Sequence, residues 1–206
     1  MVQWDAERAE RWSRSQEQRS EVYGPATERM LDLAEISSGN RVLDVAAGTG
    51  EQTLLAAERV GASGYVLATD ISSEMLNRAA NAARRAGLTN IDTRVQDAEN
   101  LDLDADSFDA VISRLGLMLL SDPQKALRGM RQVVRAGGKV AVLVFSAAEK
   151  NPYEAVARTV AHRHEEECHP CSRLVNSACL RTLSEVAVSR ISPCMLARKG
   201  ALPPLR

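Results

Sequence analysis

The chain has 206 residues, a length that fits one globular domain with a short appendage and suffices to bury a core without disulfides or metal. Its 26 Lys and Arg against 27 Asp and Glu give a net charge of -1, so it lacks the basic excess that favours nucleic-acid or membrane surfaces as partners. No apolar run reaches membrane-spanning length and the first residues are unlike a signal peptide, so we expect a cytoplasmic protein without stable membrane insertion.

Residues 1–36 predict two helices that form an N-terminal helical lid. The first is a charged helix expected from about Asp5 to Val22. The pair Gly24-Pro25 is expected to end it, with the proline in the first turn of the second helix. Trp12 and Tyr23 on these helices are candidates for closing over a ligand, and the alternative is that both are local packing anchors.

From residue 37 the chain alternates short apolar runs with amphipathic segments, which predicts strands and helices in turn. This alternation is typical of parallel βαβ units and predicts an α/β fold with an open, doubly wound, mostly parallel sheet over residues 37–160. The predicted strands are Arg41–Ala46, Tyr65–Thr69, Ile91–Gln96, Phe108–Ser113 and, after a Gly137-Gly138 turn, Lys139–Phe145. The predicted helices are Glu51–Val60, one from Ser72 or Ser73 to Gly87, and one from Asp122-Pro123 onward.

In such a sheet a ligand lies at the carboxyl ends of the strands. Gly48 and Gly50 fall at that edge, and their missing side chains allow a ligand to approach the backbone. Asp70, at the end of the second strand, can accept hydrogen bonds from two ribose hydroxyls, and Asp97 can accept one from an adenine amino group. The pattern predicts a nucleotide-like ligand. Each of these residues also has a simpler explanation without a ligand. The glycines can serve only to form a turn, Asp70 can cap the following helix, and Asp97 can be an ordinary surface residue.

Two classes of nucleotide-binding protein could carry this pattern at the edge of the sheet. A dinucleotide-binding dehydrogenase carries G-x-G-x-x-G, but Thr53 stands where its third glycine is needed. Asp44 lies four residues before Gly48, where its carboxylate opposes a pyrophosphate and favours a positive amino group or sulfonium. Together, the missing third glycine and the position of Asp44 favour a cationic nucleoside without phosphates as the ligand.

Five segments in order resemble the motifs of class I S-adenosylmethionine-dependent methyltransferases, of the ubiquinone/menaquinone-biosynthesis C-methyltransferase-like family. They are VLDVAAGTG (42–50), ATDIS with ML (68–76), QDAENL (96–101), SFDAVISR (107–114) and RQVVRAGGK (131–139). The resemblance covers about Asp5 to Tyr153. It implies a Rossmann-like fold, S-adenosylmethionine as cofactor, and methyl transfer to a small-molecule acceptor with a quinone-like ring.

The resemblance also implies a role for each matching residue. Asp44, Ala46, Gly48 and Gly50 would lie around the methionine part of the cofactor, Asp70 and Ile71 at the ribose and adenine, Asp97 and Ala98 at the adenine edge, and Ser113 and Arg114 beside the sulfonium. Arg114 has an alternative interpretation as a solvated surface charge. Two residues depart from the family pattern, Ala46 for a commoner glycine and Ala136 for the usual proline. The sequence assigns no catalytic base, and Glu99, Tyr23 and Arg114 are candidates for groups on the acceptor side.

The last quarter of the chain differs in composition from the rest. It holds all three His and all four Cys, and no aromatic residue follows Tyr153. Cys168-x-x-Cys171 is half of a zinc site, but Cys179 and Cys194 stand apart, so we expect no metal. A thiol-rich acceptor site is a further interpretation of these cysteines.

Residues 161–206 form an atypical tail. They show no recognisable version of the last strands that close the sheet in the resembled family, so the C-terminal strands are expected to be incomplete. We hypothesise that the tail is truncated or frameshifted, which resequencing the gene would test. With such a tail, the alternative function is a non-catalytic S-adenosylmethionine-binding remnant without a complete acceptor site, and only turnover on an acceptor separates the two.

Overall fold

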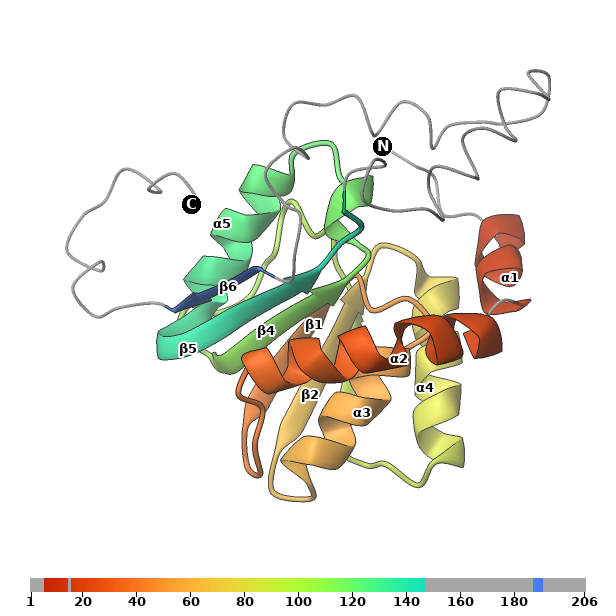
Figure 1. Cartoon of the computed structure of the whole chain (residues 1–206), viewed down its shortest axis with the longest axis horizontal. Coiled ribbons are helices and arrows are strands. Elements are labelled where there is room, and N and C mark those ends of the chain that lie inside the picture. Colours follow the sequence, from red (N-terminus) through yellow and green to blue (C-terminus); the bar gives the residue numbers. More distant parts are fainter. Residues whose placement is uncertain (1–5, 15, 147–186, 191–206) are drawn as a thin grey trace.

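The structure, a computed structural model, describes residues 6–14, 16–146 and 187–190 (Figure 1). Its helices are α1 (Ala6–Arg14), α2 (Gln16–Leu33), α3 (Glu51–Val60), α4 (Ser73–Arg85), the short 3-10 helix η1 (Leu117–Leu119) and α5 (Pro123–Val133). Its strands are β1 (Arg41–Val45), β2 (Tyr65–Asp70), β3 (Ile91–Val95), β4 (Phe108–Arg114), β5 (Val134–Leu143) and β6 (Ala187–Arg190).

The strands form one sheet in the order β3-β2-β1-β4-β5-β6. The pairs among β1 to β5 are parallel, and β6 pairs antiparallel with β5. The order reverses direction between β1 and β4, which is where ligands bind in doubly wound sheets. The predicted α/β fold with a mostly parallel sheet is confirmed.

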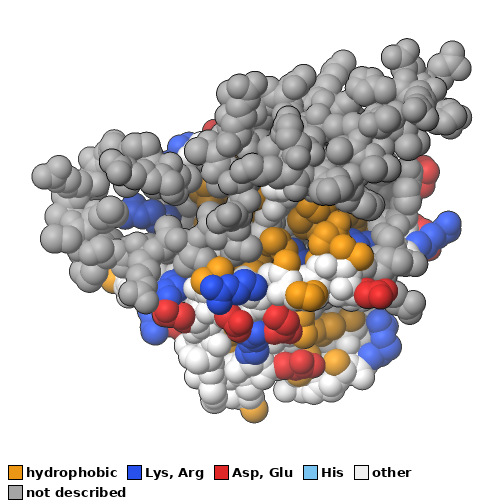
Figure 2. Space-filling view, viewed as in Figure 1, with side chains coloured by type: hydrophobic (Ala, Val, Ile, Leu, Met, Phe, Trp, Pro, Cys, Tyr) orange, Lys and Arg blue, Asp and Glu red, His pale blue; other side chains and the backbone are white. Residues whose placement is uncertain are grey.

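The central strands are apolar on both sides because helices cover both faces of the sheet (Figure 1). Alternate residues of β1 show this directly, since Val42 packs in the cluster under α2 and α3, and Leu43 packs in the cluster under α5. Charged side chains of both signs lie close together on the face that carries α2 and α3 (Figure 2). On these helices, Arg59 of α3 forms ion pairs with Glu28 and Asp32 of α2.

The predicted helix break at Gly24-Pro25 is wrong, because α2 runs through Pro25. A proline inside a helix lacks the N–H that would bond to the carbonyl one turn earlier. Fully buried Met30 and Leu31 near the end of α2 pack on the sheet and hold this part of the helix in place. Tertiary packing therefore outweighs the local cost of the proline.

The predicted turn at Gly137-Gly138 is also wrong, since both glycines lie within β5. The pairing with β4 shifts register between Phe108 and Ala110, which marks a β-bulge. Gly137 has a positive φ of 83°, and a Cβ on Gly138 would lie 2.5 Å from the backbone oxygen of Asp109. The glycines allow close strand contact at the bulge rather than a reversal of the chain.

The C-terminal strands are expected from the sequence to be incomplete, and among the described residues of the tail a short strand, β6, extends the sheet beside β5. Hydrogen bonding to the exposed edge of β5 stabilises this short segment, a non-local effect that its composition does not reveal. All His and Cys residues, and with them the zinc and thiol interpretations, lie outside the described residues. Within the described ranges, no helix is both long and apolar enough to cross a membrane.

Candidate functional site

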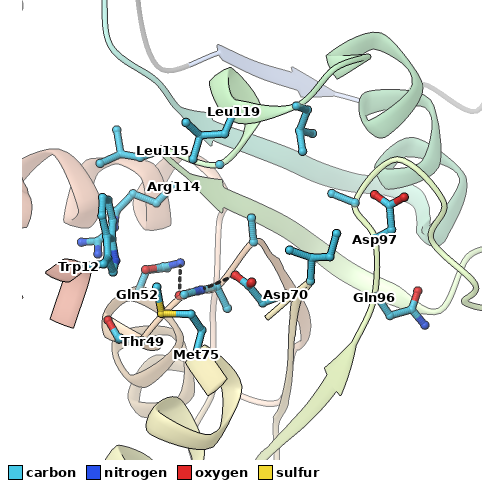
Figure 3. Close-up of a pocket in the computed structure, with 17 residues that line it drawn as sticks. Trp12, Thr49, Gln52, Asp70, Met75, Gln96, Asp97, Arg114, Leu115 and Leu119 are labelled. Atoms are coloured by element: carbon cyan, nitrogen blue, oxygen red, sulfur yellow. Dashed lines mark hydrogen bonds between the residues drawn. The ribbon is translucent and has the colours of Figure 1, made fainter. Parts of the chain in front are cut away.

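A pocket opens at the carboxyl ends of β1, β2 and β4 (Figure 3). It encloses about 830 Å³ with the solvent at its mouth included. Of the residues predicted from the sequence, Ala46, Gly48, Asp70, Ile71, Asp97, Ala98, Arg114 and the lid candidate Trp12 line it. The lining residues that the sequence analysis missed are Ala47, Thr49, Gln52, Met75, Gln96, Leu115, Gly116, Leu119 and Leu120.

Asp44 does not line the pocket, but it bonds to residues of α3 beside the pocket. The side chain is fully buried, and its carboxylate accepts hydrogen bonds from Thr53 Oγ1 at 2.6 Å and Gln52 Nε2 at 3.1 Å. Burial raises the pKa of Asp44 to about 7. Thr53, at the position of a dehydrogenase's third glycine, therefore ties the start of α3 to the end of β1.

Asp70 joins the two loops that form the pocket on the β1 and β2 side. Its Oδ2 accepts from the backbone N–H of Gly48 and its Oδ1 from that of Ser72, both at 2.9 Å. Burial raises its pKa, although these backbone hydrogen bonds oppose the shift. Each oxygen keeps lone-pair capacity for a ligand. Next to it, Ile71 is 44% exposed and lines the pocket.

Asp97 and Glu99 organise the loop after β3. Asp97 accepts hydrogen bonds from the backbone N–H of Glu99 at 2.9 Å and from Asn100 Nδ2 at 2.6 Å. Glu99 Oε1 in turn accepts from the backbone N–H groups of Ser121 and Asp122, just before α5. Glu99, weighed earlier as an acceptor-side group, thus satisfies backbone donors at the start of that helix.

Gly50 and Ser113 lie behind the lining. Gly50 has a φ of 84°, and a Cβ there would lie 2.8 Å from the Cβ of Ala79, so it permits close packing of α3 against α4. The Ser113 side chain is fully buried, and its hydroxyl has no hydrogen-bond partner in the described part of the chain. An unpaired buried hydroxyl is costly in a folded protein.

Ala46 and Gly116 form a close contact between the ends of β1 and β4. Ala46 adopts a φ of 58°, a left-handed conformation that suits glycine, the residue expected here from the family pattern. A Cβ on Gly116 would lie only 2.5 Å from the Cβ of Ala46. The methyl group of residue 46 therefore occupies the space that residue 116 leaves free.

We expect Gly116→Ala to lower the free energy of unfolding by about 1–3 kcal/mol through overpacking. Ala46→Gly alone should raise it by about 1 kcal/mol, because it relieves the left-handed alanine. The double variant should recover most of the loss, since it moves one methyl group across the contact. Urea titrations of all four proteins measure this coupling, and simple additivity of the two single changes would contradict it.

Arg114 is buried rather than a solvated surface charge. Only 8% of it is exposed, and its guanidinium forms an ion pair with Glu51 and donates to Thr27 Oγ1 at 3.2 Å. Glu51 also pairs with Arg19 of α2 at 2.6 Å. These contacts join β4, α2 and the start of α3 in the wall of the pocket. The sequence signal was weak, because Arg19 is one charge among many in its helix.

The two lid candidates differ in position. Trp12 of α1 lines the pocket, and the guanidinium of Arg19 stacks 4.0 Å from the centre of its ring. Arg19 also donates to the Trp12 carbonyl. Tyr23 is not among the lining residues, and its ring lies 5.8 Å from that of Phe145.

The remaining side of the pocket is apolar. Figure 3 places Leu115 and Leu119 across the pocket from Thr49 and Met75. These leucines belong to the run LGLMLL (115–120) directly after β4, a signal that the sequence analysis could have used. Among the described residues, no three or more His, Cys, Asp or Glu are grouped so that they could hold a metal ion.

A family model described as a methyltransferase domain matches residues 36–189. The chain belongs to this family. The predicted class of protein, a methyltransferase domain, is thereby confirmed. The matched range includes most of the tail and all of β6 except Arg190.

Named relatives of this methyltransferase domain support the same family. The protein named ubiquinone/menaquinone biosynthesis C-methyltransferase UbiE from Methylococcus capsulatus (strain Bath) is 42% identical over 117 residues, 56% of this chain and 47% of the relative. The chain spans about half the length of the curated relatives it matches.

Two solved structures illustrate the shared fold. A methyltransferase from Aquifex aeolicus described as SAM dependent has a TM-score of 0.63 at 22% identity, over 78% of this chain and 88% of that one. The 4+2 cyclase SpnF has a TM-score of 0.54 at 28% identity, over 57% of this chain and 43% of that one.

Proposed function

We propose that the protein transfers a methyl group from S-adenosylmethionine to a small apolar acceptor with a quinone-like ring. The observation that carries the proposal is the pocket itself, in which Asp70 lies across from an apolar wall that includes Leu119 and which Ile71 also lines. A carboxylate beside an exposed aliphatic side chain suits a ribose joined to a flat base. The name of the UbiE relatives supports the choice of acceptor.

The residues of the pocket fit this cofactor. Asp70 would accept hydrogen bonds from the ribose hydroxyls, and Ile71 would pack on the adenine, whose edge would meet Asp97 and the Ala98 backbone. Gly48 has no side chain and leaves room in front of Trp12 for the methionine part. The unpaired hydroxyl of Ser113 offers a further polar partner next to the pocket. Asp44 and Gly50 would act indirectly, by holding the loop after β1.

The chemistry that S-adenosylmethionine supplies is an electrophilic methyl group on a good leaving group, the sulfonium. The chain's own contribution is therefore to align the acceptor and to exclude water. Trp12 and the leucines after β4 provide an apolar surface for both tasks. Among the described lining residues, the titratable side chains are those of Asp70, Asp97 and Arg114. An acceptor that ionises readily by itself, such as a hydroquinone, suits this surface.

The proposal also covers the lid, the C-terminal tail and the location of the protein. We propose that residues 1–36 act as a lid on the cofactor-binding domain over residues 37–160, and Trp12 of α1 in the pocket supports this. We also propose that residues 161–206 are an atypical C-terminal tail, of which β6 extends the sheet. We further propose a cytoplasmic location, and the near-neutral charge supports action on a small molecule rather than on nucleic acid.

Calorimetric titration with S-adenosylhomocysteine followed by an assay of radiolabelled methyl transfer tests the proposal. Micromolar binding and turnover on hydroxylated benzo- or naphthohydroquinones are the expected results. Because a solved relative of the fold is a cyclase, binding alone is not sufficient. Binding without turnover on any acceptor would favour the non-catalytic remnant. A folded chain that binds no S-adenosylhomocysteine would contradict the proposal.

We expect Asp70→Ala to weaken S-adenosylhomocysteine binding by about 100-fold or more. The substitution removes a ligand contact and also the acceptor for the backbone N–H groups of Gly48 and Ser72. Asp104→Ala, an exposed aspartate after β3, is the matched control and should bind like wild type. Calorimetry, with circular dichroism to verify folding, measures the difference. Equal affinities of the two variants would contradict the assigned role.

A further inference from the structure

Strand β3 (Ile91–Val95) forms one border of the sheet as far as the structure describes it. Strand β2 pairs with one side of β3, and the residues from Asp92 to Val95 are exposed. Val95 is 56% exposed and is one of three exposed large hydrophobic side chains among the described residues. An exposed strand edge offers unpaired backbone groups to another chain.

The backbone of β3 shows which of its residues face this open edge. The carbonyl of Asn90 accepts from the N–H of Val66 in β2 at 2.9 Å. The N–H of Gln96 donates to the carbonyl of Asp70 in β2 at 3.0 Å. Because backbone groups alternate in direction along a strand, the even-numbered residues between these two points also face β2. The groups that face the open edge are therefore the N–H and C=O groups of Ile91, Thr93 and Val95.

The sequence of β3, Ile-Asp-Thr-Arg-Val, is complementary to its own reverse. In an antiparallel pair of two copies centred on Thr93, Asp92 of each copy lies opposite Arg94 of the other. Ile91 lies opposite Val95, so apolar side chains also meet. Opposite charges and paired threonines that face each other across two strands stabilise the pairing.

The same register uses every backbone group that faces the open edge. Hydrogen-bonded positions of an antiparallel pair take residues whose backbone groups point across, here Thr93 with Thr93 and Ile91 with Val95. Asp92 and Arg94 take the other positions, where side chains lie closer together. A slip by two residues places Asp92 opposite Asp92 or Arg94 opposite Arg94, and like charges there are destabilising. The charges therefore select one register.

We propose that β3 is a homodimer interface, at which two copies of the chain pair antiparallel about Thr93 and join their sheets. The contact is isologous, because a twofold axis passes between the two threonines. Asp92 accepts from the Tyr65 hydroxyl through Oδ2 at 3.1 Å, and its Oδ1 keeps capacity for Arg94 of the second copy. A contact along strands of five residues is small, so we expect a weak dimer that forms at micromolar or higher concentrations.

The dimer leaves each copy with its own pocket. Strand β3 leads to Gln96 and Asp97 at the pocket (Figure 3), and antiparallel pairing directs the carboxyl ends of the two copies of β3 in opposite directions. The two pockets therefore open at opposite edges of the joined sheet. The inference does not depend on the proposed function, and monomeric variants should bind S-adenosylhomocysteine as wild type does.

Sedimentation velocity over a range of protein concentrations tests the inference, with a monomer–dimer equilibrium expected for wild type. Asp92→Arg places an arginine opposite Arg94 of the second copy, and Arg94→Asp places two carboxylates opposite each other. Each variant alone should dimerise about 10-fold more weakly or worse, because both charge pairs become repulsive. An equimolar mixture of the two variants should form heterodimers, since every charge then faces its opposite again.

Three further observations complete the test. Thr93→Pro removes the central outward N–H without a hydrogen bond to β2, and should also weaken dimerisation. Asp104→Arg, at an exposed position in the loop after β3, is the matched control and should dimerise like wild type. Circular dichroism verifies that each variant folds.

Wild-type protein that stays monomeric up to millimolar concentration overturns the inference, whether or not the variants fold. A dimer that persists in both charge variants overturns it as well, because another surface then forms that dimer. A mixture of the two folded variants that stays monomeric contradicts the antiparallel register about Thr93. Loss of S-adenosylhomocysteine binding by wild type would count against the proposed function alone.

Discussion

Replacing Glu51 with glutamine is expected to lower the free energy of unfolding by about 3–5 kcal/mol. The change leaves the guanidinium groups of Arg19 and Arg114 buried without the carboxylate that both contact. A neutral amide cannot offset the lost hydration of two cations, whereas its shape is nearly that of glutamate. Urea unfolding followed by far-ultraviolet circular dichroism measures the loss.

Two further variants isolate the cause. Glu58→Gln, on the exposed side of the same helix α3, should change stability by less than about 0.5 kcal/mol. Adding Arg114→Met to Glu51→Gln should recover part of the loss, because one buried cation is removed. A Glu51→Gln protein as stable as wild type would show that the cluster is hydrated or otherwise compensated.

Asp44→Asn is expected to stabilise the protein at neutral and higher pH. Burial raises the pKa of Asp44 from 3.8 to about 7, so the folded state holds the proton more tightly than the unfolded state does. The resulting stabilisation is present at low pH and is lost as the pH rises from about 4 to about 7. The loss amounts to about 4 kcal/mol at most. Asparagine carries no charge and removes this dependence.

The difference in stability between wild type and Asp44→Asn, measured by urea unfolding at intervals from pH 4 to pH 8, reports this effect. The variant can keep both contacts, accepting from Gln52 and donating to the Thr53 hydroxyl. Asp104→Asn, at an exposed position in the loop after β3, is the control for removing a carboxylate that is not buried. A constant difference between wild type and Asp44→Asn across this range would mean that Asp44 is ionised throughout.

The parts of the fold that could be predicted are those encoded locally. The strand at 41–45 is a continuous apolar run bounded by turn residues, and α4 begins after Ser72, which caps it by accepting from the backbone of Met75. The order of strands then brings Asp70 and Asp97 to one edge without any knowledge of their contacts. That is why both aspartates were found as pocket residues.

The features that could not be predicted depend on contacts between distant segments. Arg19, Glu51 and Arg114 come from α2, α3 and β4, and each alone has the appearance of an ordinary surface charge in the sequence. Pro25 remains in a helix because of packing several residues away, and β6 exists because β5 offers it an edge. Asp44 was expected to face a ligand, but the fold turns it toward Thr53.

The dual contact of Asp70 has a consequence for the thermodynamics of binding. One side chain fixes the loops after β1 and β2 to each other before any ligand arrives. The entropy of ordering these loops is therefore lost on folding rather than on association. A nucleoside that spans both loops meets a preorganised surface, and little of its binding free energy is diverted into arranging the protein.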